Sequence, residues 1–242
     1  RDAYTLAWTL DAAVTGQAAD RLLDSYASER RPHAKAMIDL SIHMKNFVST
    51  SNPLLGVLRN VATRTARRTP GLREFLSEAK FKPRPRYEAG AYFGLPRQRR
   101  NGLEGEQLPQ PTLADRECRP LLLDEALGEG YALIGFAVDP RQSLSAADLQ
   151  QLAQLNTRYL TLYPAGGRPQ GKAAASTPAG LSEWEDMSGE CIRRFREAGY
   201  AEGAVAIVRP DRFVFAMAKP GTTQPAVHSL LEQLGLQTAT RQ

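Results

Sequence analysis

The spacing of apolar residues changes twice along this chain. Up to about residue 81, apolar positions recur at the three- and four-residue intervals of α-helices. Between residues 82 and 112, glycine and proline interrupt every regular pattern. From residue 113 onward, short apolar runs of strand length alternate with helical stretches. We therefore expect a helical segment (1–81), a connector (82–112) and an α/β domain (113–242).

Three helices are expected in the helical segment. The second opens near Ala18, meets Pro32, which should kink or restart it, and resumes to about Phe47. The third follows the Asn52-Pro53 turn and ends in a basic stretch. The first helical pattern is present from the outset of a chain that does not begin with Met, so we expect that a segment once preceded it. Its apolar positions are Ala3, Leu6, Ala7, Leu10 and Val14.

The second half is expected to contain strands and helices in the order β, α, β, α, β, β, α. Its first β, α, β part should be a parallel, right-handed unit. This order is that of a thioredoxin-like domain, so we expect an α+β protein overall. The expected strands are 131–138, 159–163, 205–209 and 213–216, and the expected helices are 146–155, 187–198 and 224–234, with an exposed loop over 165–180.

Composition and charge limit the possible partners. The chain is 42% hydrophobic and 24% charged, which is typical of a globular protein. It has no apolar run of membrane-spanning length and no signal-peptide core, so we expect a cytoplasmic protein without a membrane partner. Residues 1–100 carry 18 Lys and Arg against 9 Asp and Glu, which is +9, and the remainder is −4. These charges are spaced along helices without a nucleic-acid-binding pattern, so no nucleic acid is expected.

The two cysteines lie far apart in the sequence and do not form a CxxC pair. We expect Cys118 and Cys191 to be buried, reduced thiols that bind no metal. A thioredoxin-like oxidoreductase would need a reactive cysteine at the helix start after its first strand. That stretch is Pro140-Arg141-Gln142-Ser143 here, and no proline stands just before Val205. The domain is therefore expected to be structural or an interaction surface.

Other short motifs carry little chemical signal. Gly166, Gly171 and Lys172 fit the GxxxxGK spacing of a phosphate-binding loop, but residue 173 is Ala where a magnesium-binding hydroxyl is needed. We expect a surface loop there. Ser145 and Ser188 are expected at helix N-termini, because no GxSxG elbow surrounds either one. The histidines lack metal-ligand spacing, and ordinary surface or packing roles are expected for His33, His43 and His228.

Several segments together resemble the back portion of class A FAD-dependent aromatic-ring hydroxylases, specifically their 3-(3-hydroxyphenyl)propionate hydroxylase branch. The matching segments are Arg1-Asp2-Ala3, Leu6-Ala7-Trp8, Leu22-Leu23-Asp24-Ser25-Tyr26, Glu29-Arg30-Arg31-Pro32, His33 to Ile38, Phe81-Lys82-Pro83, Pro85-Arg86-Tyr87, Leu108-Pro109-Gln110-Pro111, Leu122-Leu123-Asp124-Glu125 and Val208-Arg209-Pro210-Asp211.

The resemblance implies a monooxygenase that hydroxylates a phenolic acid in aromatic compound catabolism, with FAD, NADH or NADPH, and O2. It also implies that the N-terminal FAD-binding portion is missing, because the chain contains no GxGxxG motif. Arg1 and Asp2 are the only residues that it places near the cofactor, and no catalytic or metal-binding residue carries over. We expect a fragment that retains no FAD and is inactive alone. The alternative is a non-enzymatic thioredoxin-like module for interaction or homo-oligomerisation.

Overall fold

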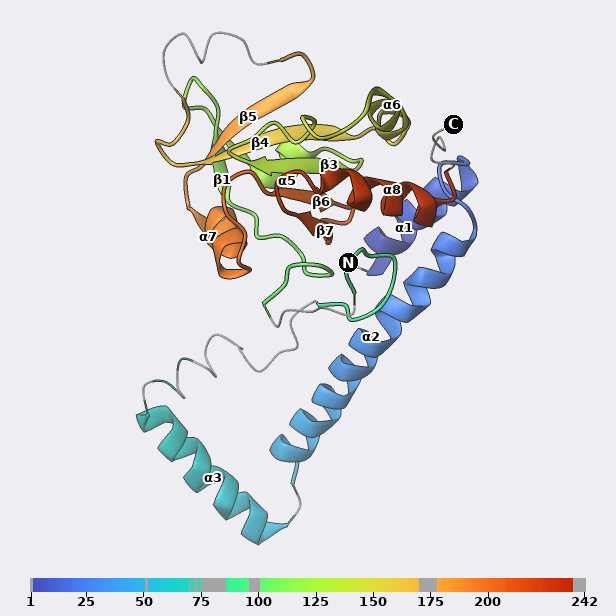
Figure 1. The fold of residues 1–242 in the computed structure, drawn as a ribbon. Helices are drawn as coiled ribbons and strands as arrows, with labels where there is room; N and C mark the ends of the chain where they lie inside the picture. Colours follow the sequence, from blue (N-terminus) through green and yellow to red (C-terminus); the bar gives the residue numbers. More distant parts are fainter. Residues whose placement is uncertain are drawn as a thin grey trace. The chain divides into compact units, whose positions relative to one another are not determined.

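The computed structural model describes residues 2–50, 52–69, 71, 74, 86–95, 101–169 and 178–236. It divides the chain into two compact units, shown in Figure 1. The larger unit joins Arg1–Ser28 to Tyr87–Gln242, and the smaller one is Glu29–Arg86. The first helix therefore folds with the C-terminal half of the chain, although more than 50 residues separate them in sequence.

Among its described residues, the N-terminal segment includes the α-helices α1 (Asp2–Val14), α2 (Arg21–Val48) and α3 (Pro53–Arg68). Of the kink or restart expected at Pro32, the restart is wrong, because α2 continues through this proline as one helix. The Asn52 side chain accepts hydrogen bonds from the Leu54 and Leu55 amides at 3.0 and 3.4 Å. This cap, with Pro53 in the first helical turn, makes α3 begin where the sequence predicted it.

A seven-stranded mixed sheet in the order β2-β1-β5-β4-β3-β6-β7 forms the centre of the larger unit (Figure 1). Strands β5, β4 and β3 are parallel, and β6 and β7 form an antiparallel hairpin beside β3. The arrangement β4-β3-β6-β7 is the expected thioredoxin-like core. The strands are β1 (Thr112–Ala114), β2 (Pro120–Leu122), β3 (Ala132–Phe136), β4 (Arg158–Pro164), β5 (Leu181–Asp186), β6 (Val205–Val208) and β7 (Val214–Ala218).

Four helices accompany this sheet: α5 (Leu123–Leu127), α6 (Ala146–Gln154), α7 (Glu190–Glu197) and α8 (Thr223–Leu234). The expected order lacked β1, β2, α5 and β5, which the structure adds. Each of these is short or rich in polar residues, so none has the apolar pattern that predicted the others. The other helices and strands of this half lie within a few residues of their predicted positions.

Both faces of the sheet are buried, and alternate residues of β3 point to opposite faces. Ala132, Ile134 and Phe136 pack in one core with Phe195 of α7. Leu133 packs in a second core with residues of α6 and α8, and Ala12 of α1 and Leu22 of α2 belong to this second core. The start of α2 is also held against α8, because the Ala19 amide donates to the Leu234 carbonyl at 2.7 Å. Helix α1 is thus part of the thioredoxin-like core.

The described part of the connector packs along β7, the last strand of the sheet. The Phe93 amide donates to the Phe215 carbonyl at 3.0 Å, and the Gly105 amide donates to the Val214 carbonyl at 2.8 Å. The Tyr87 ring stacks on Phe213 with ring centroids 4.5 Å apart. These contacts satisfy backbone groups that an edge strand would otherwise expose.

Candidate functional site

Helix α1 is the candidate functional element, because Asp2, one of the two residues expected near the cofactor, lies in it. Of the two expected cofactor-binding residues, Arg1 lies outside the described residues, and Asp2 is the first residue of the helix.

The face of α1 that packs on the larger unit is unusually polar. Thr5 and Thr9 are buried, with 1% and 0% of their surface exposed, and Ala12 continues the same face one turn later. The Thr9 hydroxyl is within hydrogen-bond distance of the Thr5 and Leu6 carbonyls, at 3.0 and 2.9 Å, so it bonds to its own helix. The Thr5 hydroxyl instead donates to the carboxylate of Asp211, which lies 206 residues away in sequence, at 3.1 Å.

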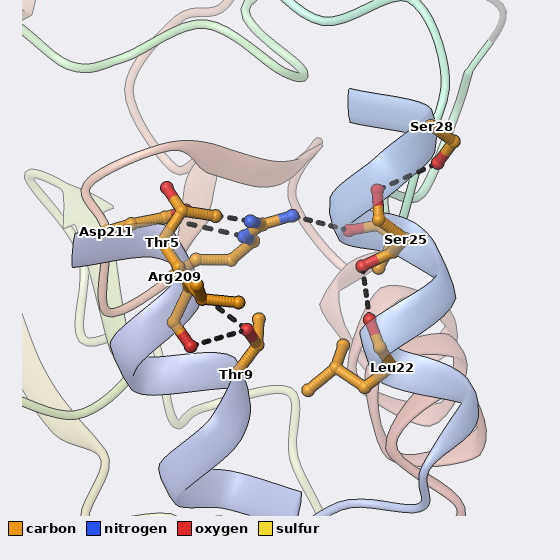
Figure 2. A network of polar contacts seen from close by, with 9 residues as sticks. Thr5, Thr9, Leu22, Ser25, Ser28, Arg209 and Asp211 are labelled. Atoms are coloured by element: carbon orange, nitrogen blue, oxygen red, sulfur yellow. Dashed lines mark hydrogen bonds and ion pairs between the residues drawn. The ribbon is translucent and has the colours of Figure 1, made fainter. Parts of the chain in front are cut away.

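Asp211 forms a buried ion pair with Arg209 in the turn between β6 and β7 (Figure 2). Arg209 donates from Nε to Oδ1 of Asp211 at 3.1 Å and from Nη2 to Oδ2 at 2.8 Å. Arg209 is 1% exposed and Asp211 is 4% exposed. Paired two-point geometry of this kind is what makes a buried charge tolerable. Thr5, Arg209 and Asp211 are called the α1 anchor below.

Aromatic rings hold the Arg209 guanidinium in place. Its central carbon lies 5.0 Å from the ring centroid of Trp8 on α1 and 4.6 Å from that of Tyr92 in the connector. Trp8 in turn meets Tyr131 edge to face, with centroids 6.1 Å apart. Arg209 also donates from Nη1 to the Ala91 carbonyl at 3.4 Å. One buried cation therefore joins α1, the connector and the β6–β7 hairpin.

The sequence predicted the hairpin but gave no sign of what its residues bind. The Arg212 amide donates to the Arg209 carbonyl at 2.9 Å, and the Arg209 amide donates to the Phe213 carbonyl at 2.9 Å, which confirms a tight turn. Arg212 adopts a left-handed backbone with φ of 71°. The Val208-Arg209-Pro210-Asp211 segment was one of the resemblance motifs, and this was the available signal for the anchor.

The opposite face of α1 is apolar and exposed. Leu10 is 43% exposed and Val14 is 85% exposed, and Tyr4 and Leu6 are exposed as well. Helix α1 thus carries hydroxyl groups toward the core and hydrocarbon toward solvent, the reverse of an ordinary surface helix. An apolar face of this kind is typical of a surface that meets another domain or chain.

The position of a thioredoxin-type redox site is occupied by an ion pair. Arg141 donates to the Asp139 carboxylate, with Nη2 and Oδ2 2.8 Å apart, and to the Ala179 carbonyl at 2.7 Å. Burial acts to raise the pKa of Asp139, but the hydrogen bonds and charge of Arg141 outweigh it and lower that pKa. The guanidinium also lies 5.6 Å from the Tyr159 ring centroid.

The two thiols lie in different environments. Cys191 is fully buried on α7, as expected, and burial raises the pKa of its thiol. Cys118 is exposed, so the prediction that both cysteines are buried is wrong for this residue. It lies in the turn before β2 with a left-handed φ of 58°. Both cysteines are free, and neither forms a disulfide.

The loop after β4 contains Gly166, the first glycine of the phosphate-binding spacing. The Gly166 amide donates to Glu185 Oε2 at 3.2 Å, and the Arg168 amide donates to Oε1 of the same carboxylate at 3.4 Å. A side chain of β5 therefore takes the amides that would meet an anion. Gly171 and Lys172 lie outside the described residues.

Ser145 is an N-cap residue, as predicted, and belongs to a polar group that joins α6 to α8. Its hydroxyl donates to Asp148 Oδ2 at 2.7 Å, and the Asp148 amide donates back to that hydroxyl at 3.2 Å. Nε2 of His228 lies 2.8 Å from Asp148 Oδ1. Burial acts to raise the pKa of Asp148, but the hydrogen bonds from Ser145 and His228 outweigh it and lower that pKa.

Within the described ranges, no group of three or more His, Cys, Asp or Glu side chains could hold a metal ion. A search of the same residues finds no helix with the length and hydropathy needed to cross a bilayer. Ser188 lies just before α7, where the Glu190 amide donates to its hydroxyl at 3.4 Å, which agrees with the predicted helix-start role.

FAD has binding requirements that can be compared with this chain. The sequence holds no glycine-rich dinucleotide loop. The pyrophosphate and ribose of FAD need such a loop and an acidic partner. The described residues alone do not fit a whole FAD.

Comparison with known proteins matches two parts of this chain to two families. The HcaD C-terminal domain family matches residues 105–233, and the FAD binding domain family matches residues 1–41. A 3-(3-hydroxy-phenyl)propionate/3-hydroxycinnamic acid hydroxylase of Klebsiella pneumoniae (strain 342) is 32% identical over 98% of this chain and 42% of its own length. The protein of the same description from Escherichia coli (strain K12) is 32% identical over 98% of this chain and 41% of its own length.

Solved structures share the fold. Aklavinone-11 hydroxylase, in a ternary complex with FAD and aklavinone, aligns with a TM-score of 0.57 and 17% identity over 97% of this chain and 39% of that one. The flavin-dependent monooxygenase PieE, in complex with FAD and substrate, aligns with a TM-score of 0.57 and 19% identity over 98% of this chain and 44% of that one. The chain thus spans less than half the length of these relatives and of the hydroxylases above. The chain belongs to the HcaD C-terminal domain family, and its counterpart is the C-terminal part of a class A FAD-dependent aromatic-ring hydroxylase.

Proposed function

We propose that this chain serves as the C-terminal portion of an FAD- and NAD(P)H-dependent monooxygenase that hydroxylates a phenolic acid. The observation that carries the proposal is the match over 98% of this chain to hydroxylases of which it covers 42%. The names of those relatives support an aromatic acid as the substrate. The flavin would supply the oxygen chemistry, and this chain would supply the helix that meets the flavin and the domain that supports this helix.

The partner implied by this proposal is the N-terminal FAD-binding portion. The exposed apolar face of α1, with Leu10 and Val14, favours a partner that buries it. In that assembly Arg1 and Asp2 would lie nearest the cofactor. We keep the division into 1–81, 82–112 and 113–242 as part of the proposal, with the first range contributing to the flavoprotein body.

A first experiment measures FAD retention by the purified chain through equilibrium dialysis and absorbance in the flavin bands. We expect the folded chain to retain no FAD and to show no NADH-dependent oxygen uptake, because it offers only the end of α1 to the cofactor. Stoichiometric FAD on the chain alone would contradict this part of the proposal.

A second experiment restores the missing portion. The segment of the Escherichia coli hydroxylase that lies before the aligned region is joined ahead of Arg1, which leaves α1 and its anchor intact. We expect the joined protein to bind FAD and to consume NADH in the presence of 3-(3-hydroxyphenyl)propionate, with hydroxylated product measured by chromatography. A folded joined protein that binds no FAD would refute the proposed function.

The same apolar face of α1 favours one alternative, a non-enzymatic thioredoxin-like module that self-associates. Analytical ultracentrifugation of the chain distinguishes the two. A concentration-independent dimer that persists in the joined protein, together with no FAD binding there, would favour the module. A monomer, or a dimer that dissociates when the FAD-binding portion is joined, would favour the hydroxylase.

A further inference from the structure

We propose that one side of helix α3 is a docking surface for the N-terminal FAD-binding portion of the longer hydroxylase. This surface consists of Leu54, Val57, Leu58 and Val61 and is called the α3 face below. The inference deepens the proposed function and rests on it, because that function supplies the partner. The interaction is between two protein surfaces and involves no contact with the cofactor.

The α3 face is apolar and open to water. Its four residues recur at the three- and four-residue intervals that place side chains on one side of an α-helix. Their exposed fractions are 80% for Leu54, 64% for Val57, 65% for Leu58 and 56% for Val61. Thr63 lies on the other side of the helix and is exposed as well. A helix with this division of side chains ordinarily packs its apolar side against another element.

The contacts that hold α3 in place use polar groups outside the α3 face. Arg59 donates from Nη1 to the Val48 and Phe47 carbonyls at the end of α2, at 2.6 and 3.5 Å. The Asn52 side chain caps the first turn of α3. A partner that covered the α3 face would therefore displace none of these hydrogen bonds.

The charge of α3 argues against a second copy of this chain as the partner. The helix carries four arginines and has no acidic residue. Two α3 faces packed on each other would bring like charges together, which disfavours an interface. Arg64 follows Val61 by about one turn, and Arg68 follows Arg64 by about one more, so both lie beside the α3 face. The partner surface should be apolar, with carboxylates near its edge.

The family matches favour the FAD-binding portion as the partner. The FAD binding domain family matches residues 1–41, which include the first part of the smaller unit, whereas the HcaD C-terminal domain family begins at residue 105. Helix α3 thus follows directly on the flavoprotein part of the chain. More than half of the Klebsiella pneumoniae hydroxylase lies outside the match. A lipid surface also accepts basic and apolar residues, but it has no such continuity with α3.

Cysteine labelling tests the docking in the joined protein described above. Leu58→Cys and its matched control Thr63→Cys are made in a Cys118→Ser background, both in the 242-residue chain and in the joined protein. Peptide mass spectrometry follows the modification of each site. We expect joining to slow labelling of Leu58→Cys by roughly tenfold or more, because a buried thiol reacts only during local opening. Labelling of Thr63→Cys should stay fast in both proteins.

The outcomes separate this inference from the proposed function. Equal labelling rates of Leu58→Cys in the chain and in a joined protein that binds FAD would overturn the docking surface and leave the proposed function standing. Slow labelling of Leu58→Cys in a folded joined protein that binds no FAD would support the docking surface and refute the proposed function.

The 242-residue chain alone tests the two other partners, through Leu58→Asp and its matched control Thr63→Asp. We expect neither self-association nor vesicle binding that depends on Leu58. A dimer in analytical ultracentrifugation that only Leu58→Asp dissociates would overturn the proposal in favour of a second copy. Flotation with phosphatidylglycerol vesicles, lost only in Leu58→Asp, would overturn it in favour of a lipid surface.

Discussion

Removing the carboxylate of Asp211 should destabilise the larger unit more than any single surface change. In Asp211→Ala, the Arg209 guanidinium stays buried at 1% exposure and loses both ion-pair hydrogen bonds, and Thr5 loses its acceptor. Breaking a buried pair by removing one partner costs about 3–5 kcal/mol. The free energy of unfolding should fall by about this amount, which is a large part of the 5–15 kcal/mol of a typical domain.

Urea unfolding followed by tryptophan fluorescence measures this change, because Trp8 and Trp184 both lie in the larger unit. The matched control is Arg119→Ala, which removes an ion pair to Asp115 at 2.6 Å whose arginine is 74% exposed. We expect no resolvable shift of its unfolding midpoint.

The double variant Arg209→Met with Asp211→Leu separates pairing from burial. Replacing both charges by apolar side chains removes the guanidinium that Asp211→Ala leaves without its carboxylate, so the double variant should lose less stability than Asp211→Ala alone. A loss below about 1 kcal/mol in Asp211→Ala would refute the reasoning, because it would mean that Arg209 finds water or another acceptor at no cost. A double variant less stable than the single one would refute it equally.

Three further outcomes are expected. Gly135→Ala should prevent stable folding, measured by circular dichroism, because an added Cβ would lie 2.0 Å from a backbone carbonyl oxygen. The lowered pKa of Asp148 contributes stability that is complete above the ordinary value of 3.8 and is lost as pH falls through the lower folded-state value. Asp148→Asn should therefore weaken the loss of unfolding free energy at acid pH, measured by urea unfolding at a series of pH values. An unchanged pH dependence would contradict this. Thiol labelling of the native protein should modify Cys118 and spare Cys191 until the protein unfolds, and equal labelling rates would contradict the burial of Cys191.

The elements with regular apolar spacing could be predicted from sequence, and those stabilised by distant polar partners could not. Strand β5 is the clearest case, because its sequence is Leu-Ser-Glu-Trp-Glu-Asp. The Glu185 carboxylate accepts hydrogen bonds from backbone amides of the loop before this strand. The fully buried Asp186 carboxylate accepts a hydrogen bond from the Ile192 amide of α7 at 3.1 Å. Carboxylates in a strand look exposed until their partners are known.

The anchor was beyond prediction for a related reason. Thr5 and Asp211 are 206 residues apart, and neither has a local pattern that indicates a buried role. Pro32 is the opposite case, because proline favours a break in a helix but α2 does not restart there and continues as one helix. The sequence did contain the resemblance motif with Arg209 and Asp211. Only the folded chain shows that these two residues form a buried ion pair.

The position of α1 bears on how such oxygenases can be recombined. Sequence families divide the chain so that residues 1–41 go with the flavin-binding part and residues 105–233 with the C-terminal part. The folded chain instead places Arg1–Ser28 in one unit with Tyr87–Gln242. A crossover between parental genes placed at the family boundary would give a hybrid whose α1 comes from one parent and its carboxylate acceptor from the other. Hybrids that inherit both from the same parent should give the higher yield of folded protein.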